Sequence, residues 1–291
     1  MESLDFTQPA QSAVYDAAAA TAFFEAAGTP ETVVAGTRFF AEHQQRGFFA
    51  GDDRMYLLVE GAVALSLGGR PLDVVKPGEI FGELATITNA RRSATAVART
   101  DCRVIALDGA NFLEAIRRTP GFALMMMSIL IDRLRLTLAR LALQKRLPAG
   151  AAAERRVFDE GTLDEIAARL GNPPPLRFAA GQTIINAGDA GTLMYFVRVG
   201  RVAISAAGRT LETVGAGGVF GEMSLVDRGA RSASAAALTE CAVLAANRAQ
   251  LIHLVEDNPE FALSLLKVVG LRLQALTLPA AGGADAPVRA A

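Results

Sequence analysis

The chain of 291 residues contains an internal repeat, and this feature constrains the fold more than any other. Residues 56–122 align with residues 195–261 at a constant offset of 139, without a gap, and 25 of the 67 aligned positions are identical. The two cysteines obey the same offset, because Cys102 aligns with Cys241. The sequence therefore predicts one domain in two copies, with each cysteine packed as a small buried hydrophobe.

Each copy has the pattern of short strands separated by glycines, followed by helix. Several short strands at close spacing are typical of a closed or rolled β-core. Helix is expected to begin near Phe112 and near Leu251. The predicted fold class is α+β, with two jelly-roll-like β-rolls and flanking helices. The expected strands are 55–59, 62–67, 72–75 and 103–107 in the first copy, and 194–199, 202–205, 211–214 and 242–245 in the second.

The second helical stretch of the first copy carries a heptad pattern, with apolar residues spaced alternately by three and four. The second copy keeps this register in a weaker form. Such a helix can pack on its own β-roll, or it can pair with its counterpart, within one chain as a pseudo-dimer or between two chains as a homodimer. The pattern leaves these alternatives open. The positions are Leu124, Met127, Ile131, Leu134, Leu138 and Leu141, matched by Leu263, Leu266, Gly270, Leu273 and Thr277.

Composition narrows the classes of function. Hydrophobic residues make up 51% of the chain, yet the longest uncharged, mainly apolar run spans only 119–131, whereas a membrane-spanning helix needs about 20 residues. The first basic residue is Arg38, so no basic segment of a signal peptide is present. We expect a cytoplasmic protein without a membrane segment. With 29 basic and 30 acidic residues, the net charge of −1 favours a small molecule or a protein as partner over nucleic acid.

The most informative strings are residues 81–95 and 220–234, hereafter the two cassettes. Glu83 and Arg92 are nine residues apart, and so are Glu222 and Arg231. A short helical turn after the glycine would direct backbone N–H groups at an anion. A guanidinium adds two parallel donors for a phosphate, whereas a carboxylate accepts from a hydroxyl. The combination favours a ligand that carries a compact anion beside a sugar hydroxyl.

Both cassettes resemble the phosphate-binding cassette of the cyclic nucleotide-binding domain family, which includes catabolite activator-type regulators and regulatory subunits of cyclic AMP-dependent protein kinase. The resemblance implies that the glutamate binds the ribose 2′-hydroxyl, that the arginine binds a cyclic phosphate oxygen, and that backbone amides complete the pocket. It implies cyclic AMP as the favoured ligand, cyclic GMP as the second candidate, and neither a cofactor nor a metal. The implied site residues are Gly82, Glu83, Leu84, Ala85, Arg92, Ser93 and Ala94, and Gly221, Glu222, Met223, Ser224, Arg231, Ser232 and Ala233.

The resemblance covers residues 31–145 and 163–277, so it extends over nearly the whole chain. We expect a first domain at 15–147, a linker at 148–161, a second domain at 162–278 and a disordered tail at 279–291. The first copy has a six-residue insertion around 40–49, outside the cassette. Ligand capture is expected to move the helices that follow each roll over the base and thereby signal to an effector protein, which the sequence does not identify.

A DNA-reading module is not expected. Residues 162–172 look like the first helix of a helix-turn-helix, but Pro173 to Pro175 follow, and three prolines cannot begin a recognition helix. The counterpart in the first copy is 16–28, so we interpret the segment as the N-terminal helix of the second domain. Residues 1–37 contain no arginine, so a kinase-inhibiting pseudosubstrate is not supported.

Three other interpretations compete with a cyclic nucleotide sensor. In the first, an Arg–Glu ion pair closes each roll without a ligand. In the second, the cassettes bind another phosphorylated or nucleoside ligand. The third is a cupin-type metalloenzyme, which needs clustered ligands inside the barrel; His43 and His253 are not at equivalent positions. No catalytic constellation is apparent in the sequence, so a non-enzymatic function is expected.

Overall fold

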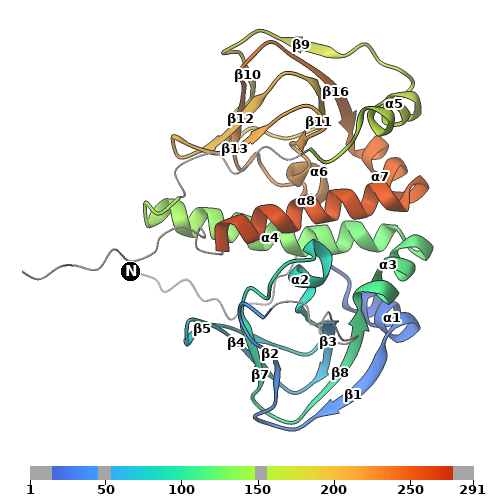
Figure 1. Cartoon of the computed structure of the whole chain (residues 1–291), viewed down its shortest axis with the longest axis vertical. Helices are drawn as coiled ribbons and strands as arrows, with labels where there is room; N and C mark the ends of the chain where they lie inside the picture. Colours follow the sequence, from blue (N-terminus) through green and yellow to red (C-terminus); the bar gives the residue numbers. More distant parts are fainter. Residues whose placement is uncertain (1–14, 45–53, 148–155, 278–291) are drawn as a thin grey trace, which may run out of the picture.

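The computed structural model describes residues 15–44, 54–147 and 156–277. Two β-rolls lie at opposite ends of the molecule, and helices lie between them (Figure 1). The first copy contains α1 (Ala17–Ala27), β1 (Thr29–Val33), β2 (Arg38–Phe40), β3 (Arg54–Glu60), β4 (Val63–Leu67), β5 (Arg70–Val75), β6 (Ile80–Phe81), α2 (Glu83–Thr88), β7 (Thr95–Ala98), β8 (Cys102–Asp108), α3 (Gly109–Arg118) and α4 (Gly121–Leu143).

The second copy repeats this element order. It contains α5 (Glu160–Arg169), β9 (Leu176–Phe178), β10 (Thr183–Ile185), β11 (Leu193–Val199), β12 (Val202–Ala206), β13 (Arg209–Val214), β14 (Val219–Phe220), α6 (Met223–Asp227), β15 (Ser234–Ala237), β16 (Cys241–Asn247), α7 (Arg248–Asp257) and α8 (Pro259–Thr277). The predicted strands and the two helix starts are confirmed to within a few residues. The remaining short strands were not predicted, and they include β1, β2, β6, β7, β9, β14 and β15.

Each roll consists of two four-stranded antiparallel sheets, and the strand orders match between copies. The first roll has the orders β1-β8-β3-β6 and β2-β7-β4-β5, and the second has β9-β16-β11-β14 and β10-β15-β12-β13. The register repeats as well, because Tyr56 opposes Phe81 and Tyr195 opposes Phe220. Both cysteines are free and buried in the roll interiors, as predicted. The predicted α+β fold is confirmed.

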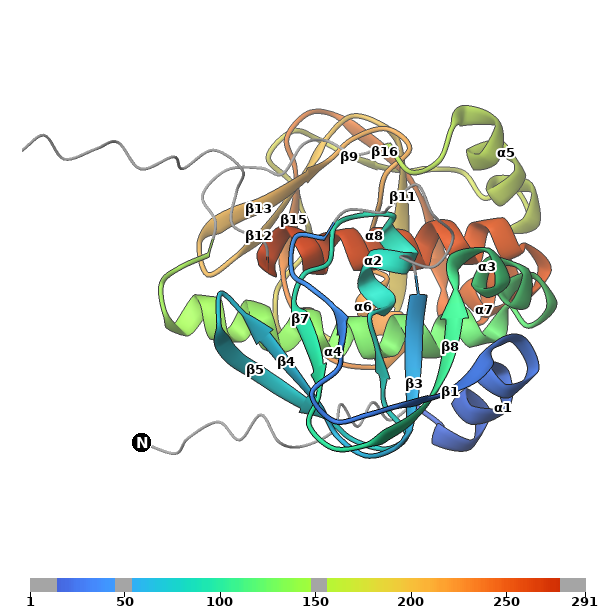
Figure 2. The same cartoon turned by 60° about the horizontal axis from the view of Figure 1, so that its bottom comes forward.

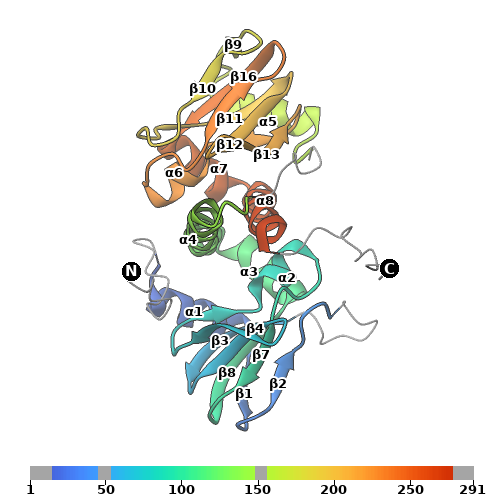
Figure 3. The ribbon, with the colours of Figure 1, turned by 90° about the vertical axis from the view of Figure 1, so that its left-hand side faces the viewer.

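Helices α4 and α8 pack against each other between the two rolls (Figure 3). The helices that precede them, α3 and α7, lie at the same end of the pair in Figure 1, so α4 and α8 run parallel. Heptad residues from both copies share one continuous core, including Ile131 and Leu134 from α4 and Leu266 and Leu273 from α8. Of the alternatives that the heptad pattern left open, the structure forms the pairing within the chain.

The helix pair also contacts the cassettes, and each helix reaches the cassette of the other copy. Figure 2 brings the first roll forward, with α2 close to α8. Gly270 of α8 lies so near α2 that a Cβ atom there would come within 2.9 Å of the Thr88 methyl carbon. On the other side, Arg135 of α4 forms a bidentate ion pair with Asp227 and donates to the Ala230 carbonyl oxygen at 2.7 Å. These contacts place a part of each copy at the other copy's cassette.

The segment that resembled a helix-turn-helix forms one helix, α5, and residues 173–175 lead into strand β9. Its counterpart is α1, which confirms the interpretation as the N-terminal helix of the second domain. Helix α5 begins at Glu160, two residues inside the range assigned to the linker. Residues 148–155 of that range, the tail 279–291 and part of the insertion at 40–49 lie outside the described residues. Among the described residues, no helix has the length and apolar content needed to cross a membrane.

Candidate ligand-binding site

A glycine in the left-handed region opens each cassette. Gly82 has φ of +77° and Gly221 has φ of +82°, a conformation that L side chains rarely adopt. A Cβ atom on Gly221 would also come within 2.9 Å of an Arg231 guanidinium nitrogen. The chain then enters the short helices α2 and α6, as the sequence predicted. Glycine at these two positions therefore permits both the turn and the close approach of the arginine.

Glu222 is 1% exposed, and only one of its carboxylate oxygens has a partner in the described part of the chain. Its Oε1 accepts a hydrogen bond of 2.7 Å from Arg272 of α8, whereas Oε2 is buried and accepts none. An unsatisfied buried acceptor is costly, and more so when it is charged. The second oxygen of Glu222 is thus available to a hydroxyl donor from outside the protein.

Arg272 connects α8 to the roll of its own copy. It donates to Glu212 at 2.8 Å and to the Val219 carbonyl oxygen at 2.6 Å, in addition to its bond with Glu222. Burial opposes the charge of Arg272, but the carboxylates of Glu212 and Glu222 more than compensate, so its pKa lies above the ordinary value for arginine. The guanidinium is therefore a fixed cation between two carboxylates.

The cassette arginine of the second copy, Arg231, is 9% exposed. Its guanidinium donates to the Gly221 carbonyl oxygen and to the Ser224 hydroxyl, each at 2.7 Å, and to the Leu193 carbonyl oxygen. Burial lowers its pKa, and electrostatic interactions with Tyr195, Glu222 and Asp189 only partly offset this effect. None of the ion pairs within the described residues includes Arg231. A buried cation with neutral acceptors alone suits an anionic ligand.

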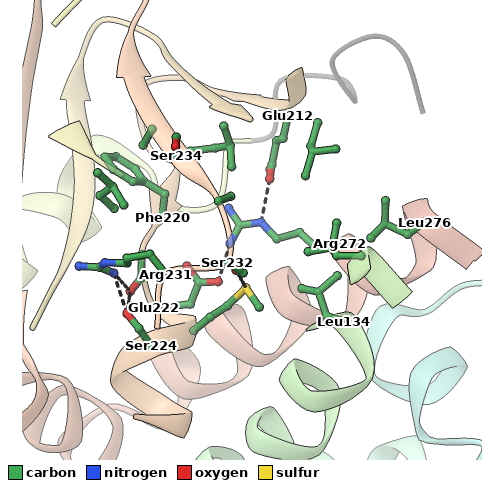
Figure 4. Close-up of a pocket in the computed structure, with 18 of the residues that line it drawn as sticks. Leu134, Glu212, Phe220, Glu222, Ser224, Arg231, Ser232, Ser234, Arg272 and Leu276 are labelled. Carbon is green, nitrogen blue, oxygen red and sulfur yellow. Dashed lines mark hydrogen bonds and ion pairs between the residues drawn. The ribbon is translucent and has the colours of Figure 1, made fainter. Parts of the chain in front are cut away.

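All seven residues predicted for the second site line one cavity of about 110 Å³, hereafter the cassette cavity (Figure 4). Glu222, Arg231 and Ser232 lie on one side of it, with Arg272 and Glu212 beyond them. The remaining wall is apolar and comes from both copies. It includes Leu211 from the roll, Leu276 from α8, and Leu134 and Leu138 from α4 of the first copy.

The first site repeats this arrangement with differences. Glu83 is 3% exposed and pairs with Arg133 of α4. Arg92 donates to the carbonyl oxygens of Gly82 and Arg54 at 2.8 Å each, and its guanidinium lies 4.3 Å from the ring centre of Phe40. Leu84, Ala85 and Ala94 are buried, and Ser93 is half-buried beside Arg92. The structure therefore brings the predicted residues of this cassette together as well.

The sequence interpretation missed the two helix arginines. Arg133 and Arg272 are themselves 139 positions apart, so the repeat contained a signal that would have found them. The glutamates pair with these helix arginines, and Glu222 forms no ion pair with Arg231. The alternative in which the cassette Arg and Glu close the second roll against each other is thus wrong.

The metalloenzyme interpretation finds no support in the geometry. His43 lies in the first copy and His253 on α7 of the second, and both side chains are exposed, so neither points into a roll. Within the described ranges, no group of three or more His, Cys, Asp or Glu residues is arranged to hold a metal ion.

Two β-rolls with equivalent cassettes define a tandem ligand-binding protein. A model of the cyclic nucleotide-binding domain matches residues 44–119 and 175–258, which together make up more than half of the chain. The chain belongs to the cyclic nucleotide-binding domain family. Both matched ranges correspond to a ligand-binding domain and not to a catalytic one.

Relatives include a protein kinase regulatory subunit and a cyclic AMP receptor protein. The cAMP-dependent protein kinase regulatory subunit of Eremothecium gossypii is 27% identical over 202 residues, which cover 66% of this chain and 37% of that protein. The Cyclic AMP receptor protein of Thermus thermophilus is 40% identical over 95 residues, which cover 30% of this chain and 44% of that protein. The matches thus span less than half the length of these two relatives.

Among solved structures, the regulatory domain of Toxoplasma gondii PKA with cAMP is 22% identical, with a TM-score of 0.29, and the match covers 79% of this chain and 83% of that one. The regulatory subunit of a cAMP-independent protein kinase A from Trypanosoma brucei is 17% identical, with a TM-score of 0.30, and covers 80% of this chain and 79% of that one.

Proposed function

We propose that each cassette binds a 3′,5′-cyclic nucleotide, with cyclic AMP favoured over cyclic GMP, and that the protein is a non-catalytic sensor. The single observation that best supports this proposal is the pairing of two unsatisfied groups in the cassette cavity. Among the described residues, Glu222 has a buried oxygen without a donor, and Arg231 is a desolvated cation that forms no ion pair. A ribose hydroxyl and a cyclic phosphate would satisfy both at once.

The base would lie in the apolar half of the cassette cavity. Leu211 and Leu276 belong to the second copy, whereas Leu134 and Leu138 belong to α4 of the first. Apolar and aromatic walls with a few polar anchors are typical of small-molecule sites. A base in this position would touch helices of both copies, so occupancy of the second site would favour one arrangement of α4 against α8.

Signalling to a partner protein would follow from that rearrangement. The helix pair lies between the rolls and carries contacts to both cassettes, so a shift at one cassette changes the surface presented by both helices. We propose only the kind of effector, which is a protein that recognises one arrangement of the helix pair.

Titration calorimetry tests the ligand assignment on the full chain. Cyclic AMP, cyclic GMP and cyclic di-GMP are titrated into the wild type, Arg92→Ala, Arg231→Ala and the double variant. Loss of one charge-assisted contact is expected to cost about 2 kcal/mol, roughly a thirtyfold loss of affinity. We expect two sites in the wild type, one of which is lost in each single variant.

Arg91→Ala is the matched control, because Arg91 is exposed and adjacent to Arg92 and its counterpart in the second copy is Ala230. It should bind like the wild type. Unchanged nucleotide affinity in the double variant would contradict the site assignment. Binding of a nucleoside or another phosphorylated compound in place of cyclic nucleotides would replace the proposed ligand and keep the site.

A further inference from the structure

A second cavity, of about 360 Å³, lies behind the Glu212–Arg272 ion pair in the second copy, and we call it the rear cavity. Its walls come from β13, β14, α8 and the segment at 156–157 that precedes α5. The apolar part of the wall includes Val214, Val219 and Val268. Arg156 and Lys267 add two cations, and Ser264 adds a hydroxyl.

The repeat supplies an internal comparison, because the first copy has larger residues at the equivalent positions. Ser264 corresponds to Met125, which is buried, and Gly218 corresponds to Glu79. In the first copy the Tyr15 hydroxyl also donates to the Gly78 carbonyl oxygen at this place. Small residues in the second copy thus leave space where the first copy places side chains.

The charge of this region reverses between the copies. Four lining residues of the rear cavity have charged counterparts in the first copy. Glu212, Gly218, Leu271 and Arg272 correspond to Asp73, Glu79, Asp132 and Arg133, so three counterparts are acidic and one is basic. In the second copy, Glu212 is the only carboxylate lining the cavity, and three cations accompany it. Lys267 takes the place of Ser128, and Arg156 adds a further cation from the segment that precedes α5. A region with net negative charge in one copy therefore has net positive charge in the other, which favours an anion.

The two added cations are placed differently. Arg156 is held in position, because its Nε donates to the Phe158 carbonyl oxygen at 3.3 Å and the neighbouring amides of Val157 and Phe158 donate to the Gly217 carbonyl oxygen. Lys267 is exposed, and none of the ion pairs among the described residues includes it. Glu212 is already engaged by Arg272. The excess positive charge is therefore not balanced by the walls.

We propose that the rear cavity binds a small organic anion with an apolar body, such as a carboxylate, separately from the cassette cavity. The anionic head would lie between Arg156 and Lys267, with the apolar body against Val214, Val219 and Val268. The proposal does not depend on which ligand occupies the cassettes, because the two cavities have only Glu212 and Arg272 as common lining residues.

The fluorescent anion 8-anilinonaphthalene-1-sulfonate is the probe, titrated into the full chain. Two variants carry the first-copy residue into the second copy: Lys267→Ser removes the exposed cation, and Ser264→Met fills the space. Loss of one charge-assisted contact predicts a rise in the dissociation constant of about tenfold for Lys267→Ser. Ser264→Met is expected to abolish saturable binding. Octanoate should displace the dye, and 1-octanol at equal concentration should do so at least about tenfold less well.

Two control variants locate the dye. Arg177→Ala removes an exposed cation on β9, away from both cavities, and Arg231→Ala alters only the cassette cavity; both should bind the dye within about twofold of the wild type. Unchanged dye affinity in Lys267→Ser and Ser264→Met would overturn the proposal. Loss of dye binding in Arg231→Ala would overturn it as well, by placing the dye in the cassette cavity. If Ser264→Met fails to fold by circular dichroism, Lys267→Ser decides, because its side chain is exposed.

Discussion

At the scale of single residues, Glu222 best shows the chemistry of the candidate site. One of its oxygens holds Arg272 and the other has no donor within the described chain. A fold that buries a carboxylate ordinarily satisfies both oxygens, since a buried charge is expensive. The protein instead retains this cost at the same cavity where Arg231 forms no ion pair with any described residue. Such uncompensated groups are expected at functional sites.

Glu222→Gln should weaken cyclic nucleotide binding at the second site about tenfold or more, because an amide oxygen is a poorer acceptor than a carboxylate and the ribose contact loses its charge. Calorimetry in an Arg92→Ala background isolates that site. Glu212→Gln is the matched comparison, since it also removes one carboxylate from Arg272 but leaves the acceptor at Glu222 intact.

The smaller loss is expected for Glu212→Gln. Equal losses in both variants would mean that the effect arises from the charge on Arg272 and not from a contact between Glu222 and the ligand.

Among the elements, α4 reaches from the first copy to the cassette of the second. Arg135 forms a bidentate ion pair with Asp227 at the end of α6, and Arg135 and Asp227 are 24% and 8% exposed. It also binds the Ala230 carbonyl oxygen, one residue before Arg231. The equivalent position in α8 is Gln274 and the equivalent of Asp227 is Thr88, so the ion pair exists on one side only. The two cassettes are therefore linked to the helix pair by different chemistry.

Asp132 lies near this ion pair and makes the stability of the fold depend on pH. Partial burial raises the pKa of its carboxyl group, the charge of Asp227 raises it further, and Arg135 opposes both. A raised pKa in the folded state means that the ionised carboxylate destabilises the fold at neutral pH, and that the penalty disappears as the pH falls through the folded pKa.

Asp132→Asn should therefore raise the melting temperature at pH 7, by a small amount corresponding to about 0.5 kcal/mol, because water screens the half-exposed carboxylate. Near pH 4 the difference from the wild type should shrink, since Asp132 is then increasingly protonated in the wild type. Thermal unfolding followed by circular dichroism at both pH values measures this. A variant that is less stable than the wild type at pH 7 would contradict the expectation.

At the scale of the whole molecule, the second site is built from both copies. Leu138 belongs to the first copy by sequence, yet it lines the cassette cavity of the second. Leu138→Ala should weaken nucleotide binding at the second site by about 1–2 kcal/mol, or roughly fivefold to thirtyfold, through loss of apolar contact. Calorimetry in the Arg92→Ala background provides the readout.

The control is Leu136→Ala, because Leu136 lies on the same helix, is 59% exposed and points away from the cavity wall. It should leave the affinity within about twofold of the wild type. Equal affinity in Leu138→Ala and in the wild type would mean that the second site is complete within its own copy.

Local sequence patterns predicted much of the fold of this protein. The offset of 139, the glycine-bounded strands and the Gly-Glu and Arg-Ser-Ala strings predicted two β-rolls and placed all fourteen candidate residues at the cassettes. These features depend on neighbours a few residues away, so periodicity and turn chemistry reveal them. The short strands β7 and β15 escaped prediction because Ala and Ser carry little strand signal.

The tertiary structure decided how the two copies combine. The heptad pattern required an apolar partner for α4 but was compatible with its own roll, with α8 and with a second chain, because burial is non-directional. Only the folded chain brings Arg272 into an ion pair with Glu222 and places Leu138 in the wall of the cassette cavity. Both contacts join residues that lie far apart in the sequence. The repeat determined that there are two cassettes, and the packing of α4 against α8 decided that the cavity at the second cassette includes residues from both copies.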